Sequence, residues 1–273
     1  MLKKIGPDST GVVSIQDQTD ETLSWITFPK TQIAANPQEW TDVPFTIKIP
    51  KSAGYGYYFA VQFVLSNNSS ANAKVAGSGA VPILLTVNRP GAKAEGQLVL
   101  FNTDSLINEY LPVSFTTMIK STGNIYIKPH GDIFIRGFGD SEIGTIEVNT
   151  AQGAILPGAV RVFNSTWDDG FVVSEPVIDN GRYLTDAKGN VVKHLVIHWD
   201  RLTHFRIGKY TASLLMVYDN GKRDAVIEST TSFWVFPYKI FAVFILALII
   251  FLIVIRLLLK WYVRKAIKKA GKK

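Results

Sequence analysis

Short runs of apolar and β-branched residues alternate with turn-forming residues over most of this chain. Between residues 12 and 236 the runs are rich in Val, Ile, Phe, Tyr and Thr, and Gly, Pro, Asn and Asp separate them. In one run, Phe45, Ile47 and Ile49 alternate with polar residues, which is typical of a strand with one face on a core and the other in water. Sustained helical periodicity is absent from this sequence region. The pattern predicts an all-β fold here.

A stretch of linker composition divides the predicted strands into two series. Residues 90–96, PGAKAEG, combine Pro and Gly with small and charged residues. We therefore expect a first module at residues 1–89, then this linker, then a second module at residues 97–236. Strands are expected at 23–28, 43–49, 57–65 and 81–87 in the first series, and at 98–102, 113–120, 124–128, 133–136, 144–148, 160–167, 191–199, 210–218 and 225–235 in the second.

The second series has the strand number and spacing of an immunoglobulin-like β-sandwich. About nine short strands with Gly and Asn turns predict that fold, with an inserted hairpin over residues 168–190. Asn220 and Gly221 predict a two-residue type I′ turn between the last two strands, because both residues tolerate a positive φ angle. The first series has fewer strands than a closed sandwich needs. We expect two immunoglobulin-like modules, the first of them incomplete.

The longest apolar run lies near the C-terminus. From Ile240 to Ile255, sixteen residues carry no charge or strong polar group. Residues 257–259 extend this run, because the long side chain of Arg256 can reach toward the membrane surface. At about 1.5 Å per residue, about 20 residues cover about 30 Å, which is the thickness of a bilayer core. The sequence predicts a transmembrane helix at residues 237–259. A buried core helix is the alternative, but the flanking residues do not favour it.

Charge is concentrated after this run. The chain has 29 Lys and Arg against 22 Asp and Glu, and residues 256–273 hold eight of the basic residues and no acid. The remainder, 29 − 8 = 21 bases against 22 acids, is close to neutral. The basic character therefore gives no reason to expect nucleic acid as a partner of the folded part. Lys and Arg collect on the cytoplasmic side of a membrane, so residues 260–273 are expected to be a cytoplasmic tail and residues 1–236 to lie outside the cell.

Aromatic and basic side chains flank the predicted helix at both ends, as expected of a single-pass protein of the cell membrane. Helical spacing of the basic residues would place a cationic stripe on anionic lipid head groups. A stop-transfer signal with no further role is the alternative, and it is the simpler explanation of the tail. We expect the membrane-interface residues to be Trp234, Tyr238, Lys239, Arg256, Lys260, Trp261, Tyr262, Arg264, Lys265, Lys268 and Lys269.

The sequence contains no cysteine, which excludes disulfides, thiolate catalysis and Cys-ligated metal sites. This composition suits an exported bacterial protein. An outside N-terminal region needs an export signal, but residues 1–7 are followed by polar, turn-forming sequence instead of an apolar segment. We therefore expect the chain as given to start late, without its signal peptide and the opening strands of the first module. A tail-anchored topology with cytoplasmic modules would contradict the charge rule.

Histidines form the main candidate metal cluster. His194 and His198 share a predicted strand face with Asp200, and His204 follows after a short loop. Four residues along a strand cover roughly 13 Å, which is too far for two ligands of one ion. We expect no metal or other cofactor here.

Adjacent carboxylates at Asp168 and Asp169 could bind calcium if neighbouring carbonyls helped, although a turn explains them more simply. Motifs for nucleophilic catalysis, phosphate binding and dinucleotide binding are absent from the sequence. The sequence therefore predicts a protein that is not an enzyme.

Several strand phrases resemble a known family. Segments 25–28 (WITF), 44–50 (PFTIKIP) and 54–61 (GYGYYFAV) are similar to strands of the WxL-interacting-protein-like membrane proteins of Gram-positive bacteria. Segments 122–129 (TGNIYIKP), 156–161 (LPGAVR) and 233–237 (FWVFP) resemble the second part of the same proteins. The resemblance implies a signal peptide, two sandwiches, one C-terminal helix and an interaction role at the cell surface.

Two functional hypotheses follow. In the first, the chain is a non-catalytic adhesion or interaction protein that binds another surface protein or an envelope polymer through loops or a strand edge. In the second, it is a structural spacer that holds an N-terminal region away from the membrane. The long aromatic-bearing segment 168–190 favours the first hypothesis. A metal-dependent hydrolase is a third class, which metal analysis of the purified ectodomain would test.

Overall fold

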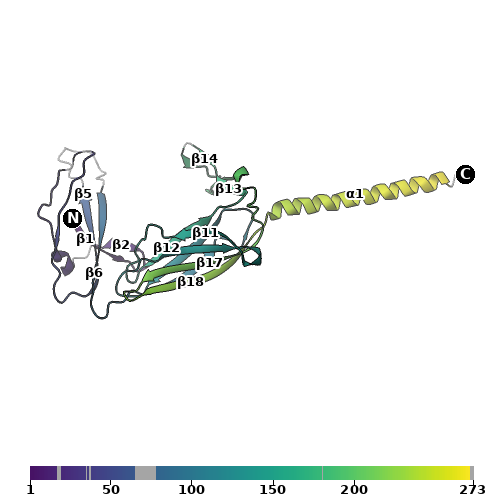
Figure 1. Cartoon of the computed structure of the whole chain (residues 1–273). Coiled ribbons are helices and arrows are strands. Elements are labelled where there is room, and N and C mark those ends of the chain that lie inside the picture. Colours follow the sequence, from purple (N-terminus) through teal and green to yellow (C-terminus); the bar gives the residue numbers. More distant parts are fainter. Residues whose placement is uncertain (17–19, 35, 37, 65–77, 180, 271–273) are drawn as a thin grey trace.

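The chain forms a strand-rich region followed by one long helix (Figure 1). The structure is a computed structural model, and it describes residues 1–273 except 17–19, 35, 37, 65–77, 180 and 271–273. For residues 262–270 it describes the backbone and not the side chains. Strands are the main regular structure of the described residues before Tyr238. The prediction of a mostly β fold with a C-terminal apolar helix is confirmed. The helix, α1, is Tyr238–Ala270.

Within residues 1–89, here called the first module, the described strands form a four-stranded antiparallel sheet and a separate two-stranded sheet. The larger sheet has the order β2-β1-β5-β6, and the smaller one pairs β3 with β4. The ring of Trp25 meets Tyr57 edge to face at 4.6 Å, which packs the segment before β3 against the sheet. The bounds are β1 Leu2–Pro7, β2 Val13–Gln16, β3 Ile26–Thr27, β4 Thr46–Ile47, β5 Tyr55–Val64 and β6 Ser78–Val87.

Local strand predictions are least accurate in this module. The strand expected at 23–28 is largely a 3-10 helix, Glu21–Trp25, because the Asp20 carboxylate accepts the Thr22 amide at 2.9 Å and caps it. The strand expected at 43–49 is reduced to β4. Strand β1 was not expected, since its local signal is weak, yet it pairs with both β2 and β5. Long-range pairing overrides local preference at these positions.

The second module consists of two sheets that pack face to face. One has the order β11-β10-β17-β18-β8 and the other β12-β9-β7. Most pairs are antiparallel, and β8 is parallel to β18. The bounds are β7 Gly96–Thr103, β8 Ile107–Asn108, β9 Val113–Ser121, β10 His130–Arg136, β11 Glu142–Val148, β12 Val160–Trp167, β17 Gly208–Asp219 and β18 Asp224–Val235.

An aromatic core joins the two sheets of the second module. Phe115 on β9 meets Phe233 on β18 at 5.6 Å, and Trp167 meets Tyr210 at 5.2 Å. These side chains are buried because residues alternate inward and outward along each strand, as the sequence pattern of β9 already shows. Burying each large apolar side chain contributes about 1.5–3 kcal/mol, so this core is the main source of stability of the module.

The last hairpin is present, but its turn differs from the prediction. Asp219 pairs with Asp224, so the loop has four residues and not two, and among the described residues of this loop only Gly221 has a positive φ, 85°. The Asp219 carboxylate accepts the Gly221 amide at 2.7 Å, and the side chain of Asn220 accepts the next two amides at 3.0 Å. Side-chain acceptors thus satisfy a wider loop and make a type I′ turn unnecessary.

Other predictions for the second module gave mixed results. The strand expected at 160–167 is confirmed to the residue as β12. The strand expected at 124–128 is wrong: this segment makes only an isolated bridge between Ile127 and Ile155. Ile127 is buried in the core, and Ile125 and Tyr126 pack partly against it, although the segment belongs to no sheet. This packing explains why its apolar pattern resembles a strand.

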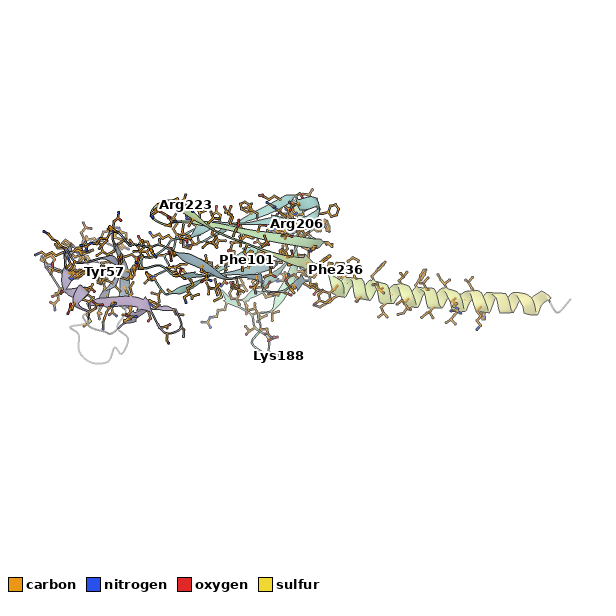
Figure 2. All side chains as sticks on the ribbon, turned by 90° about the horizontal axis from the view of Figure 1, so that it is seen from below. Tyr57, Phe101, Lys188, Arg206, Arg223 and Phe236 are labelled. Carbon is orange, nitrogen blue, oxygen red and sulfur yellow. The ribbon has the colours of Figure 1, made fainter. Side chains whose placement is uncertain are left out.

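A double hairpin projects from the second module, and we call it the arm, residues 172–197. The insertion was expected at residues 168–190, whereas the arm begins at residue 172 and ends at residue 197. Figure 2 shows Lys188 near the tip of the arm, pointing away from the body of the module. The arm consists of β13 Val172–Pro176 paired with β16 Lys193–Ile197, and β14 Ile178–Asp179 paired with β15 Arg182–Tyr183.

The first module packs against the end of the second module that is opposite to α1 (Figure 1). Ile5 and Ala60 belong to the same buried cluster as the core of the second module. Tyr58 and Tyr126 meet edge to face across the junction at 6.3 Å. Burial raises the pKa of Tyr58 to about 12, so its hydroxyl stays neutral at physiological pH. The junction therefore carries no charge at this tyrosine, and the Val160 amide adds a hydrogen bond across it by donating to the Gly11 carbonyl at 2.9 Å.

Candidate functional site

Helix α1 is the first candidate functional element. Residues Tyr238–Trp261 form a 24-residue stretch with mean hydropathy 3.2, and none of its most apolar window is buried against the rest of the protein. At about 1.5 Å per residue this stretch is about 36 Å long, which is enough to cross a bilayer core of about 30 Å. Among the described residues it is the helix that could span a membrane.

The expected interface residues lie at both ends of this stretch. Trp234 and Tyr238 are exposed where the helix begins, and Arg256, Lys260 and Trp261 are exposed near its other end. Backbone helix continues to Ala270, beyond the expected end of the apolar helix at residue 259. The basic tail is thus helical over much of its length. The side chains of Tyr262, Arg264, Lys265, Lys268 and Lys269 lie outside the described residues.

The base of α1 is held by the segment around β8. Lys239 Nζ lies 2.5 Å from the Glu109 carboxylate, which is largely buried. The Phe236 amide donates to the Asn108 carbonyl at 2.8 Å, and the Phe236 ring stacks on Phe241 at 4.5 Å. Sequence reasoning missed Glu109, because nothing in the local pattern shows that β8 lies beside β18. These contacts tie the orientation of the helix to the second module.

An apolar cleft of about 190 Å³ opens beside the helix base. The second module contributes Tyr110, Phe171 and Phe205, and the first turn of α1 contributes Ile240. Burial, together with the neighbouring Glu109 carboxylate, raises the pKa of the Tyr110 hydroxyl. The cleft is small and almost entirely apolar, so it offers packing space at the helix base and no evident chemistry.

A charged cluster fixes the base of the arm. Asp169 Oδ1 lies 2.6 Å from His204 Nδ1, and its Oδ2 accepts Arg206 Nη2 at 2.7 Å. Arg206 Nε also donates to the Asp169 carbonyl at 2.9 Å, and the guanidinium lies 5.7 Å from the centre of the buried Trp167 ring. The largely buried Arg206 is therefore neutralised and held in one orientation. This arrangement is structural support for the segments on either side of the arm.

The histidines considered as metal ligands belong to separate contacts. His198 Nε2 lies 3.0 Å from Glu175, whereas His204 pairs with Asp169. His194 is exposed on β16, and Asp200 lies beside Arg201 at 3.7 Å. Asp168 is exposed, and its carbonyl accepts Arg201 Nη1 at 3.0 Å. Among the described residues, no group of three or more His, Asp or Glu could hold a metal ion.

The arm carries apolar side chains that no core covers. Ile178 and Tyr183 are exposed on its tip hairpin, and Leu195 and Ile197 are exposed on β16. Val173, by contrast, is buried where β13 meets Leu111. Several exposed apolar side chains on one projecting element are typical of a protein interaction site. Leu184 and Val191 complete this exposed set.

The first module offers a second candidate surface. Within the described residues, β6 lies at the edge of its sheet and pairs only with β5. Val81 on this edge is exposed, as is Phe63 on the neighbouring strand. Pro82 removes one donor from the middle of the strand, which is a common feature of edge strands. The edge could accept a strand on either side of Pro82.

Comparison with known proteins gives no relative for this chain: no family model, no curated protein and no solved structure matches it.

Proposed function

We propose that this chain is a non-catalytic surface protein, anchored in the cell membrane by α1, that binds another surface protein or an envelope polymer. The observation that carries the proposal is the arm, which projects from the second module and exposes Tyr183 and Leu195. Exposing apolar side chains to water is unfavourable, so a partner that covers the arm would explain why the arm carries them.

The proposed topology places residues 1–236 outside the cell and the basic end of α1 in the cytoplasm. The excess of Lys and Arg after the apolar stretch supports this orientation. In the same proposal, the basic residues of the tail contact anionic lipid head groups. The two modules are of the immunoglobulin-like type, as the resemblance to WxL-interacting-protein-like bacterial proteins implies.

A structural spacer is the second candidate, and one observation favours it. The first module, the second module and α1 follow one another in space (Figure 1), so the first module lies far from the helix. An arrangement of this kind would carry a binding surface away from a membrane even if the arm itself bound nothing.

Photo-crosslinking in the native host tests the binding proposal. A benzophenone amino acid replaces Tyr183 on the arm, and in a matched control it replaces Lys222, which is exposed on the β17–β18 loop. We expect the Tyr183 position to form an adduct with one surface protein or polymer, and the Lys222 position to form none. The adduct should also be lost when Leu195→Asp places a charge on the same arm. Equal products from both positions, or no adduct from the arm, would contradict binding through the arm.

A further inference from the structure

The end of the second module from which α1 leaves, here called the proximal end, gathers three connections that are far apart in sequence. The register places them there: Ile107 pairs with Trp234, Gly208 with Val235, and Arg136 with Thr211 on the first residues of β17. The connections are therefore the segments 104–112, 137–141 and 198–207. Figure 2 shows Arg206 and Phe236 toward this end and Arg223 at the other.

Each of the three connections exposes large apolar side chains. Phe138 is 101% exposed, Leu106 is 71% exposed and Trp199 is 69% exposed. Leu202 and Phe205 are also exposed. We call these five side chains the proximal rim. Because these side chains are exposed, they add nothing to the core of the module, and their apolar character needs another explanation.

The rim side chains of the third connection are held outward by packing at their base. Phe171 stacks on Phe205 with ring centres 4.6 Å apart and meets Trp199 edge to face at 5.7 Å. The Phe171 amide also donates a hydrogen bond to the His204 carbonyl at 2.9 Å, which fixes the position of this backbone segment. The rim in this region is therefore preorganised.

The opposite end of the second module differs. Its connections, residues 122–129, 149–159 and 220–223, are all described, and none exposes a large hydrophobic side chain. Part of that end is covered by the first module, but the loop 220–223 is exposed apart from Asn220 and polar throughout. Of the connections compared here at the two ends of the second module, those at the end that faces α1 are therefore the ones that expose large apolar side chains.

The rim lies at the level of the first turn of α1. Phe205 and Ile240 line the same cleft, and Glu109 contacts Lys239. If α1 spans a bilayer from Tyr238, this level is the membrane interface, where Trp and other amphipathic rings concentrate. Trp199 and Leu106 would then join Trp234 and Tyr238 in one belt. The three connections carry no excess of basic residues: they hold four Asp or Glu and two Arg. Arg136 lies near Asp140, and Arg201 near Asp200.

We propose that the proximal rim inserts into the interfacial layer of the outer leaflet, so that the second module is docked on the bilayer in a fixed orientation. The inference rests on the proposed anchoring by α1 and adds a second, peripheral membrane contact. Because the three connections carry no excess of basic residues, the docking is apolar and does not require anionic lipid. One consequence is that the arm is held at a defined height above the membrane.

Site-directed spin labelling of the full chain tests this docking. The chain has no cysteine, so one introduced Cys carries the only label. Labels replace Phe138 or Leu202 on the rim, Lys222 at the opposite end, and Ile249 within α1. The chain is reconstituted in phosphatidylcholine vesicles, and collisions are measured with oxygen, which partitions into lipid, and with a water-soluble nickel complex. The measured quantity is the ratio of the collision rate with oxygen to the collision rate with the nickel complex. We expect this ratio to be several-fold higher for the rim labels than for the Lys222 label.

The controls separate the possible outcomes. Replacing half of the lipid by phosphatidylglycerol should leave the ratio of oxygen to nickel collisions at the rim labels unchanged. Rim labels that behave like the Lys222 label, while Ile249 reports lipid, would overturn the docking and leave the anchoring intact. Water-like behaviour at Ile249 as well would overturn both. Rim labels shielded from oxygen and nickel alike, in detergent and in vesicles, would show a protein contact and also overturn the docking.

A second measurement places the label away from the rim. A fluorophore on Lys222→Cys reports its distance from acceptors in the bilayer by energy transfer. With the native rim we expect a narrow distance distribution, and with the double variant Phe138→Asp, Leu202→Asp a broader one. Lys188→Asp on the arm is the matched control and should leave the distribution narrow. An equally broad distribution with the native rim would contradict the proposal.

Discussion

The two modules have similar strand-rich sequences but bury their apolar side chains to different extents. In the second module, Phe115, Phe233 and Met216 are fully buried between two sheets. In the first, Phe59 is buried, while Phe45 and Phe63 are exposed. The first module also shares part of its buried cluster with the second. The comparison teaches that the second module is the stable unit, and that the first module depends on it for part of its core.

The largest expected effect comes from the core of the second module. Phe233→Ala removes a fully buried ring that contacts Phe115, Trp167 and Tyr210, so we expect a loss of about 3–5 kcal/mol in the free energy of unfolding. Trp234→Ala, on the adjacent but exposed position, should cost well under half as much. Chemical unfolding of the full chain in detergent micelles measures both. Equal losses would show that the sheets do not pack as described.

A smaller effect is expected at the base of the arm. Asp169→Ala removes the carboxylate that neutralises Arg206 and leaves a largely buried cation without its partner. We expect a loss of about 2 kcal/mol, less than for a fully buried pair because Asp169 is partly exposed. Hydrogen exchange should show faster opening of residues 198–207, with β9 unaffected. Asp168→Ala is the matched control, since that carboxylate is exposed, and a similar response to both variants would contradict this role of Asp169.

The smallest effect is a pH dependence confined to the first module. Hydrogen bonds from Lys4 and from Thr22 lower the pKa of Asp20 from 3.8 to about 2. A carboxyl with a depressed folded pKa stabilises the fold above its unfolded pKa, and this contribution is lost as the pH falls from about 4 to 2. After allowance for solvent screening, we expect about 1 kcal/mol.

Hydrogen exchange at β1, compared between pH 5 and pH 3, measures this contribution of Asp20. Asp20→Asn should remove the difference at β1. An unchanged pH response in that variant would show that another group is responsible.

How far the sequence predicts the structure differs between the same two regions. Strand β12 was predicted to the residue because alternation and turn signals agree there. In the first module, a side-chain cap at Asp20 and the long-range pairing of β1 override the local pattern. Alternation along a strand indicates which residues face a core, but it does not show which strands meet.

The candidate surfaces follow the same distinction. The apolar stretch of α1 is contiguous in sequence, and its length alone predicts a helix that could cross a membrane. The Asp169 cluster joins residues 35 and 37 positions apart, and the proximal rim joins three connections that only the sheet register brings together. Sequence spacing contains no information on these contacts, so they required the structure.

We propose that α1 anchors the modules outside the cell with the basic end of the helix inside. Because the chain has no cysteine, a membrane-impermeant maleimide tests it with single Cys variants in intact cells of the host. We expect Lys222→Cys to be labelled in intact cells and Lys268→Cys to be labelled only after the membrane is permeabilised. Labelling of Lys268→Cys in intact cells, with protection of Lys222→Cys, would contradict this topology.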